Sequence, residues 1–429
     1  MKKVNVCIFF CCLLLVRCSL LEEEDAMIDI PDIVVPDDPT PTPVSPVYEV
    51  VVVESEENSC ENGFSGDYPC SNYSLLNRIN LTVLQSDFAN DNWGWTDPET
   101  GKEYVLQGLN DGTAFVDISS PTMARYIGKL PTATEESTWR DIKVYNNHAF
   151  IVSEAANHGL QVFDLTRLRD QTEFQQFTAD ASLTSFGDAH NIAINEASGY
   201  AYVIGANQYN GGPIFIDIST PTEPTIMGGY GDSSYTHDAH IVTYSGPDPD
   251  YQGREILFGS NSDDGDNNQV VIVDVTDKAA PYLISNATYS NGGYTHQNWI
   301  DEDHRFLYVG DEMDERRFGN PTKTLVFDLE DLDKPSLYYS YLGVTSAIDH
   351  NGYTKGDSYF LANYTAGFRE IDIENIEAAS MTEIGFFDTY PENDSNSFNG
   401  VWNVYPYFES GVIAISDSNR GLFLVRRSN

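Results

Sequence analysis

The sequence predicts an all-β protein, a seven-bladed β-propeller that an N-terminal strand closes and a disordered tether precedes. Three observations predict this fold. A short apolar run that ends on an acidic residue returns seven times, the segments between runs read as short strands, and no long amphipathic helical pattern occurs after residue 75. A repeat of this kind means that one small unit recurs and buries a face against the next.

The seven runs each place apolar residues before an acidic residue, which Arg426 replaces in the last run. They lie at 114–118, 160–165, 214–218, 271–275, 325–329, 369–373 and 422–426. Subtracting neighbouring acidic positions (117, 164, 217, 274, 328, 372 and 426) gives intervals of 47, 53, 57, 54, 44 and 54 residues. An Asp that ends a strand can accept N–H bonds from the following turn, so we interpret these carboxylates as structural and not catalytic.

The third repeat shows what one unit contains. Four segments rich in β-branched and aromatic residues, 191–195, 200–204, 213–218 and 224–227, are separated by Gly, Asn, Asp and Pro. Four strands repeated seven times are typical of a β-propeller, which leaves only short, protected edges.

The two ends of the chain predict how the ring closes. Only three residues follow Arg426, so the last unit lacks the outer strand that the others have. The segment 79–84 reads as an isolated strand before the first unit, and it can complete the last sheet and remove an exposed edge. The sequence therefore predicts a propeller over 79–429.

The N-terminus resembles that of an exported bacterial lipoprotein. Residues 1–17 combine a basic start with an apolar stretch too short to span a membrane, which is typical of a signal peptide, and Cys18 follows at the position that is lipidated in such proteins. Arg17 departs from the small residue expected before that cysteine, and the other interpretation is that Cys18 is only another cysteine of the apolar segment. We expect a lipid anchor and an address outside the cell or at the outer-membrane surface.

Residues 18–59 are predicted to form an acidic, Pro-rich, disordered tether. This segment has six prolines, and from 19 to 59 it contains no Lys or Arg, so it cannot bury enough apolar area to fold. The acidic cluster 22–25 is either a surface-export signal or solvated linker.

The cysteines and the net charge indicate the compartment of the protein and the kind of partner it can bind. Cys60 and Cys70 are the only cysteines of the globular part, in a loop segment over 60–78, and in an exported chain they predict one disulfide. The formal charge is −43, from 66 acidic against 23 basic residues, and this repels nucleic acid. We expect a monomeric propeller that touches a membrane only through its lipid anchor.

Histidines recur at the start of the first strand in four successive units: His190, His240 (with His237 three residues before it), His296 and His350. The first strand of a propeller unit is innermost, so these side chains are expected to converge at the channel mouth. His237 and His240 are three residues apart, so a regular strand cannot aim both inward. The whole candidate funnel, with the residues that other units carry at the same place, is Trp93, Trp95, Trp139, Arg140, Asp141, Glu154, Asp188, His190, His237, Asp238, His240, His296, Asp349, His350 and Trp402.

Three interpretations of this funnel stay open. Each histidine can bond the backbone of its neighbour and fix the spacing between units. The funnel can bind an organic or saccharide ligand, with the tryptophans as stacking surfaces and Arg140 as an anion clamp. Alternatively His190, His240, His296 and His350 can hold a divalent metal that polarises water, although no compact metal-binding motif is present.

Several segments resemble the choice-of-anchor B family of exported bacterial proteins. The resemblance rests on 92–101, 112–117, 137–145, 294–297 and 398–407, on the short N-terminal cysteine loop, and on runs such as 271–274 that are similar to the LVIVD repeat. It covers about residues 60–429. It implies a secreted or surface-tethered propeller whose anchor varies between members, and it implies no reaction and no catalytic residues.

The sequence therefore favours a binding module whose partner is a protein, a glycan or a small extracellular ligand. The alternative is a metal-assisted extracellular hydrolase or lyase that uses the channel histidines. No cofactor is required by the sequence, and a divalent metal is the one candidate.

Overall fold

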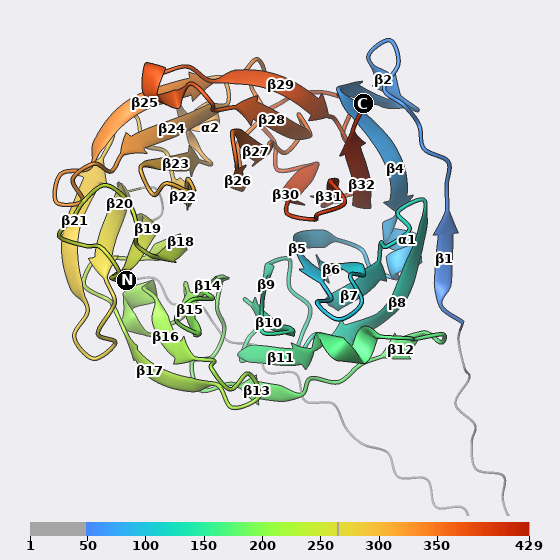
Figure 1. Ribbon diagram of the computed structural model, residues 1–429, viewed down its shortest axis with the longest axis horizontal. Coiled ribbons are helices and arrows are strands. Elements are labelled where there is room, and N and C mark those ends of the chain that lie inside the picture. Colours follow the sequence, from blue (N-terminus) through green and yellow to red (C-terminus); the bar gives the residue numbers. More distant parts are fainter. Residues whose placement is uncertain (1–48, 264–265, 429) are drawn as a thin grey trace, which may run out of the picture. The chain divides into compact units, whose positions relative to one another are not determined.

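The computed structural model describes residues 49–263 and 266–428, which form seven small antiparallel sheets around a common axis (Figure 1). The predicted all-β seven-bladed propeller is confirmed. The predictions for the signal peptide, for Cys18 and for most of the tether fall on residues 1–48, outside the described residues.

The blades follow one another along the chain, and each is written from its innermost strand outward. Blade 1 consists of β5 (Ala89–Thr96), β6 (Glu103–Leu109), β7 (Gly112–Asp117) and β8 (Met123–Pro131). Blade 2 consists of β9 (Arg140–Tyr145), β10 (His148–Ser153), β11 (Leu160–Asp164) and β13 (Ala181–Leu183). Blade 3 consists of β14 (Asn191–Asn195), β15 (Tyr200–Ile204), β16 (Ile214–Asp217) and β17 (Thr225–Gly229). Blade 4 consists of β18 (Thr236–Thr243), β19 (Glu255–Asp263), β20 (Asp266–Asp274) and β21 (Tyr282–Thr288).

The second half of the ring repeats this order. Blade 5 consists of β22 (Thr295–Ile300), β23 (Phe306–Asp311), β24 (Lys323–Asp328) and β25 (Ser336–Leu342). Blade 6 consists of β26 (Gly352–Lys355), β27 (Ser358–Ala362), β28 (Phe368–Asp372) and β29 (Thr382–Phe387). Blade 7 consists of β30 (Val401–Tyr405), β31 (Val412–Asp417), β32 (Gly421–Arg427) and β4 (Tyr73–Ile79). Short helices occupy loops: α1 (Leu81–Leu84), α2 (Asp314–Phe318), η1 (Leu165–Leu168), η2 (Tyr209–Gly211) and η3 (Ile376–Ala378).

The apolar core lies between the blades. The described residues form seven hydrophobic clusters, and each cluster joins two neighbouring blades, including blade 7 with blade 1. Strand β15 shows how the sequence achieves this: Ala201 and Val203 face blade 2, whereas Tyr202 and Ile204 face blade 4. Both faces of a middle strand are therefore apolar, because every sheet is covered on both sides.

The closing strand differs from the prediction. Strand β4 pairs antiparallel with β32 from Ile79 opposite Leu422 to Tyr73 opposite Arg427, so closure by an N-terminal strand is confirmed but its position is not. The predicted strand over 79–84 is wrong beyond Ile79, because 81–84 form helix α1, whose first turn is capped when the Val83 N–H donates to Asn80 Oδ1 at 2.9 Å. Alternating apolar residues at 79–84 imitate a strand, but Leu84 is fully buried where blades 7 and 1 meet.

Three further segments lie on the outside of the ring. β1 (Val51–Glu54) pairs with β8 on the outer edge of blade 1, so the predicted tether over 18–59 is wrong for these residues. β12 (Gln175–Gln176) also pairs with β8. The hairpin β2 (Phe64–Ser65) and β3 (Tyr68–Ser71) extends blade 6 through β29. The predicted Cys60–Cys70 disulfide is present at the base of this hairpin, with Cα atoms 6.0 Å apart.

The acidic residue that ends each third strand has the predicted structural role. In six blades its Oδ1 accepts an N–H from two residues later, at 2.8–3.0 Å; the residues are Asp117, Asp164, Asp217, Asp274, Asp328 and Asp372. These bonds hold the turn into the fourth strand. Within the described part of the chain, no helix has the length and apolarity needed to cross a bilayer.

Candidate functional site

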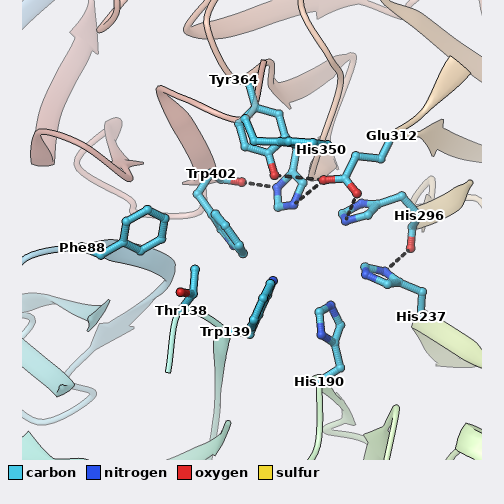
Figure 2. Close-up of a pocket in the computed structure, with 11 residues that line it drawn as sticks. Phe88, Thr138, Trp139, His190, His237, His296, Glu312, His350, Tyr364 and Trp402 are labelled. Atoms are coloured by element: carbon cyan, nitrogen blue, oxygen red, sulfur yellow. Dashed lines mark hydrogen bonds and ion pairs between the residues drawn. The ribbon is translucent and has the colours of Figure 1, made fainter. Parts of the chain in front are cut away.

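One mouth of the central channel is hollowed into a cavity of about 370 Å³, which we call the rim cup. Its walls come from the inner strands and adjoining loops of several blades (Figure 2). The lining residues are Phe88, Thr138, Trp139, His190, His237, His296, Glu312, His350, Tyr364, Phe398 and Trp402. Figure 2 shows the four imidazoles in an arc on one side, with Trp139 and Trp402 on the other.

Irregularities at the start of the inner strands aim these side chains into the cup. The pairing register shifts between Thr236 and Asp238, between Thr295 and Asn298, and between Val401 and Asn403. The residues inside these shifts include His237, His296 and Trp402. A β-bulge adds an unpaired residue and turns its side chain away from the regular alternation. The same local device thus supplies one lining residue from each of three blades.

The four imidazoles form a continuous row. Ring centroids are 4.2 Å apart for His190 and His237, 4.2 Å for His237 and His296, and 4.3 Å for His296 and His350. The Trp402 ring continues the row 5.0 Å from His350. Imidazoles 47, 59 and 54 residues apart in sequence are therefore neighbours in the ring, as the convergence argument predicts.

Hydrogen bonds fix three of these rings through Nδ1. His237 Nδ1 lies 2.9 Å from the carbonyl oxygen of His296, and His350 Nδ1 lies 2.5 Å from that of Trp402. A carbonyl oxygen only accepts, so both Nδ1 atoms carry the proton and both Nε2 atoms keep a lone pair. His190 Nδ1 lies 2.5 Å from Glu154 Oε1. Two of these bonds reach the backbone of the next blade, which is the spacing role that the structural interpretation expects.

Glu312 faces the end of the row. Its carboxylate oxygens lie 3.8 Å from His296 Nε2 and 3.7 Å from His350 Nε2, and one oxygen accepts the Tyr364 hydroxyl at 2.9 Å. Burial raises the pKa of Glu312 to about 7 and lowers the pKa of His350 to about 3. Burial and the neighbouring imidazoles hold the pKa of His237 and of His296 well below the usual range. The floor of the cup therefore offers neutral imidazoles at neutral pH.

Aromatic side chains form the opposite wall. Trp139 on this wall is 44% exposed, and Phe398, which packs against Tyr364 with ring centroids 5.5 Å apart, is 40% exposed. Phe88 packs edge-on against Trp402 at 6.0 Å. The cup thus combines uncovered aromatic surface with a polar floor, which is the usual composition of a small-ligand site.

Comparisons with known proteins agree with this architecture. A family model described as the LVIVD repeat matches residues 186–232 and 265–288. The chain is a β-propeller, and two of its segments are similar to the LVIVD repeat. The solved β-propeller domain of Cps50 (Swd1) from Myceliophteria thermophila is similar at 10% identity and a TM-score of 0.52, covering 82% of this chain and 99% of that domain.

A second solved structure, titled a functionally unknown protein from Desulfotomaculum acetoxidans DSM 771, is similar at 11% identity and a TM-score of 0.50, covering 77% of this chain and 89% of that one. At these identities the similarity concerns the fold alone. No curated protein matches the chain.

In this propeller, His240 does not join the other predicted metal ligands. It stacks on Trp299 with ring centroids 3.8 Å apart, and it lines a small cavity of about 50 Å³ on a different stretch of the channel. The bulge at His237 explains this difference. It directs the His237 side chain into the cup, and the strand then resumes its regular alternation, which directs His240 into the smaller cavity. The row of imidazoles at the cup therefore consists of His190, His237, His296 and His350, and His240 is not part of it.

Several other predicted residues lie outside the cup. Trp93 and Asp238 line the same small cavity as His240, and Lys143 lies 4.7 Å over the Trp93 ring. Burial raises the pKa of Asp238 to about 7. Trp95 stacks on Tyr104 between blades 1 and 2 and donates its indole N–H to Asn147.

Arg140 and Asp141 do not line the cup, and Arg140 lies in a smaller cavity beside the imidazole row. Arg140 is buried, donates from Nε to the Leu109 carbonyl at 3.1 Å and meets His158 Nε2 at 3.0 Å. Burial lowers the pKa of Arg140 to about 10. Asp141 pairs with Lys143 at 2.6 Å and accepts the Ile192 N–H of blade 3 at 2.8 Å. These contacts join neighbouring blades.

Two predicted carboxylates also lie away from the floor. Asp188 accepts the Asn207 amide at 3.2 Å in a rim loop. Asp349 is fully buried, and neither of its carboxylate oxygens has a hydrogen-bond partner among the described residues. Burial and the nearby Asp314 raise its pKa well above the usual range.

The list of candidate funnel residues did not include Glu312, Tyr364, Phe88, Thr138 or Phe398. Glu312 follows the second strand of blade 5, the place where blade 2 carries Glu154, so the repeat alignment held a signal for it. The three aromatic residues lie in loops of different lengths, and the repeat gives no equivalent position for them.

Proposed function

We propose that this LVIVD propeller is an exported, lipid-anchored binding module that takes a carbohydrate in the rim cup. The observation that carries the proposal is the pairing of two surfaces in one cavity: exposed indole and phenyl faces, and a floor of neutral imidazoles with free Nε2 atoms. Aromatic faces stack on the apolar side of a sugar ring, and imidazole nitrogens accept bonds from hydroxyl groups.

The proposal includes membership of the choice-of-anchor B group, a signal peptide over 1–17 and lipidation of Cys18. The disulfide supports an oxidising compartment, and the LVIVD repeats support the resemblance to exported propellers. We infer an address at the outer surface of the cell, where a glycan or a glycosylated protein is available as a partner.

Titration with a panel of defined soluble oligosaccharides tests the cup, with binding measured by calorimetry in the presence of a chelator. We expect at least one sugar to bind, and Trp139→Ala to weaken that binding about fivefold, because a lost aromatic stacking contact is worth about 1 kcal/mol. Trp139 is 44% exposed, so its truncation leaves the core intact.

Phe64→Ala is the matched control, since Phe64 is 54% exposed on the β2–β3 hairpin and does not line the cup. It should bind sugar like the unmodified protein. Absence of binding across the panel at millimolar concentration, or equal affinities for Trp139→Ala and the parent, would contradict the carbohydrate proposal.

The lipid anchor has its own test. Cys18→Ser should move the protein from the membrane fraction to the soluble exported fraction, because a lipid chain supplies the attachment. Cys12→Ser, within the signal peptide, should leave the membrane fraction unchanged. A Cys18→Ser protein that stays with the membrane would show that something other than this cysteine holds it there.

The second candidate function is a metal-assisted extracellular hydrolase or lyase. The contact of Glu312 with the Nε2 atoms of two imidazoles favours it. Its first requirement is a bound metal ion, and turnover of any substrate should then stop on addition of a chelator.

A further inference from the structure

We infer that the floor of the rim cup is a binding site for one divalent transition-metal ion, held by His296, Glu312 and His350, with His237 next to the open side. The inference goes beyond carbohydrate binding and does not rest on it, although His350 belongs to both proposed sites, so the metal is tested in the absence of sugar. The ion class is that which imidazole prefers, such as Zn²⁺, Co²⁺ or Ni²⁺.

Three ligand atoms converge at the right spacing. One nitrogen each from His296 and His350 and one oxygen from Glu312 all lie within 4.8 Å of one another. The two nitrogen–oxygen distances, 3.8 and 3.7 Å, are too long for hydrogen bonds. Bonds of about 2.0–2.1 Å around a tetrahedral ion place its ligands about 3.4 Å apart, so a small closure of the three groups accommodates an ion.

Hydrogen bonds fix the tautomers of His350, one of the ligands, and of the neighbouring His237. His350 donates its Nδ1 proton to the Trp402 carbonyl, and His237 donates its Nδ1 proton to the His296 carbonyl. Each ring therefore presents an unprotonated Nε2. Metal-ligating histidines almost always donate their other N–H in this way, to a backbone carbonyl or a carboxylate, which orients the ring before the ion arrives. His190 makes the corresponding hydrogen bond to a carboxylate, that of Glu154.

His296 supplies an independent sign of a missing partner. The side chain is 3% exposed, its Nδ1 is buried without a hydrogen-bond partner, and its Nε2 lies 3.8 Å from the nearest carboxylate oxygen. A buried ring nitrogen without a hydrogen-bond partner among the described residues is costly, because no partner replaces the water that burial removes. An ion on Nε2 gives this ring a partner.

The remaining surroundings suit a small-molecule or water ligand on the ion. The site opens into the cup, so at least one coordination position faces solution, as in metal sites that exchange ligands. The Tyr364 hydroxyl donates to Glu312 at 2.9 Å and holds that carboxylate over the two imidazoles. The acidic chain also attracts cations to its surface.

Metal content of the full-length protein, measured after dialysis against Zn²⁺ and then against metal-free buffer, tests the site. We expect one Zn²⁺ per chain. Competition with a chromogenic chelator should show that Glu312→Gln and His350→Ala each weaken Zn²⁺ binding by at least about tenfold. With Co²⁺, the parent protein should show the visible absorption of a low-coordinate nitrogen and oxygen site, and both variants should lose it.

His240→Ala is the matched control, because it removes a buried histidine of the same channel that stacks on Trp299 and contributes nothing to the cup. It should keep one Zn²⁺ with unchanged affinity. Glu312→Gln keeps the shape of the side chain, so unfolding is a poor explanation for its loss of metal, and its melting curve checks this. Absence of stoichiometric Zn²⁺, or equal losses in Glu312→Gln and His240→Ala, would overturn the proposal. Because no sugar is present, its failure leaves the carbohydrate result untouched.

Discussion

At the scale of the residue, one extra position in a strand decides which histidine serves the cup. His237 and His240 both open the fourth blade, and a regular alternation can place only one of them at the mouth. The bulge selects His237 and leaves His240 stacked on Trp299, where its Nδ1 accepts the Ile300 N–H at 3.2 Å. A bulge leaves no certain mark in sequence, so the choice between these residues could not be predicted.

The different surroundings of His240 have a measurable consequence for stability against pH. Burial lowers the pKa of His240 to about 3 in the folded protein, while the unfolded chain takes up the proton near pH 6.5. Below pH 6.5 the unfolded state therefore binds more protons, and this contribution to stability is lost as pH falls. The loss at pH 4.5 is about 2–3 kcal/mol, from 1.36 kcal/mol per pKa unit.

His240→Gln removes this titration and keeps a polar acceptor. Denaturant unfolding at pH 7 and pH 4.5 should show that the parent loses about 2–3 kcal/mol more than the variant over this interval. All other titrating groups act on both proteins and cancel in the comparison. Equal losses in the two proteins would mean that His240 is protonated in the folded state.

At the scale of the element, the repeat is a strand whose two faces belong to two different cores. The apolar pattern was visible in sequence because every middle strand is covered by a blade on each side, as Tyr202 and Val203 illustrate. The Asp that ends each third strand was also interpretable, because its hydrogen bond is local. Interactions between residues close in sequence can be predicted from the sequence. The row of imidazoles in the cup depends on contacts between blades, which cannot be predicted in this way.

The segment before the first blade shows where local patterns mislead. Apolar and polar residues alternate over 79–84 as in a strand. The segment 81–84 nevertheless forms a helical turn, because Asn80 caps it and Leu84 packs in the interface between blades 7 and 1. Strand β4 closes the ring because it pairs with β32, which lies more than 340 residues away in sequence. Tertiary contacts of this kind override local propensity, so closure was predictable and its position was not.

At the scale of the whole molecule, the ring is what brings four histidines from four blades within touching distance. Loss of one of the seven hydrophobic clusters would leave the other six interfaces between blades in place. The distances between the imidazoles would then no longer be fixed. The cluster between blades 7 and 1 is the one built from the two ends of the described chain, with Leu76 and Ile79 on β4 and Leu422 and Leu424 on β32. Ring integrity and site geometry therefore depend on the same strand.

Ile79→Ala tests this dependence. Ile79 is fully buried in that cluster, so its truncation should lower the free energy of unfolding by about 2–5 kcal/mol, from lost burial and the cavity left behind. Val52→Ala is the control, because Val52 is 45% exposed on β1 and its truncation should change stability by less than about 0.5 kcal/mol. Guanidinium unfolding followed by circular dichroism measures both. If the two variants unfolded at the same midpoint, β4 would not be holding the ring closed, and the convergence of the imidazoles would need another cause.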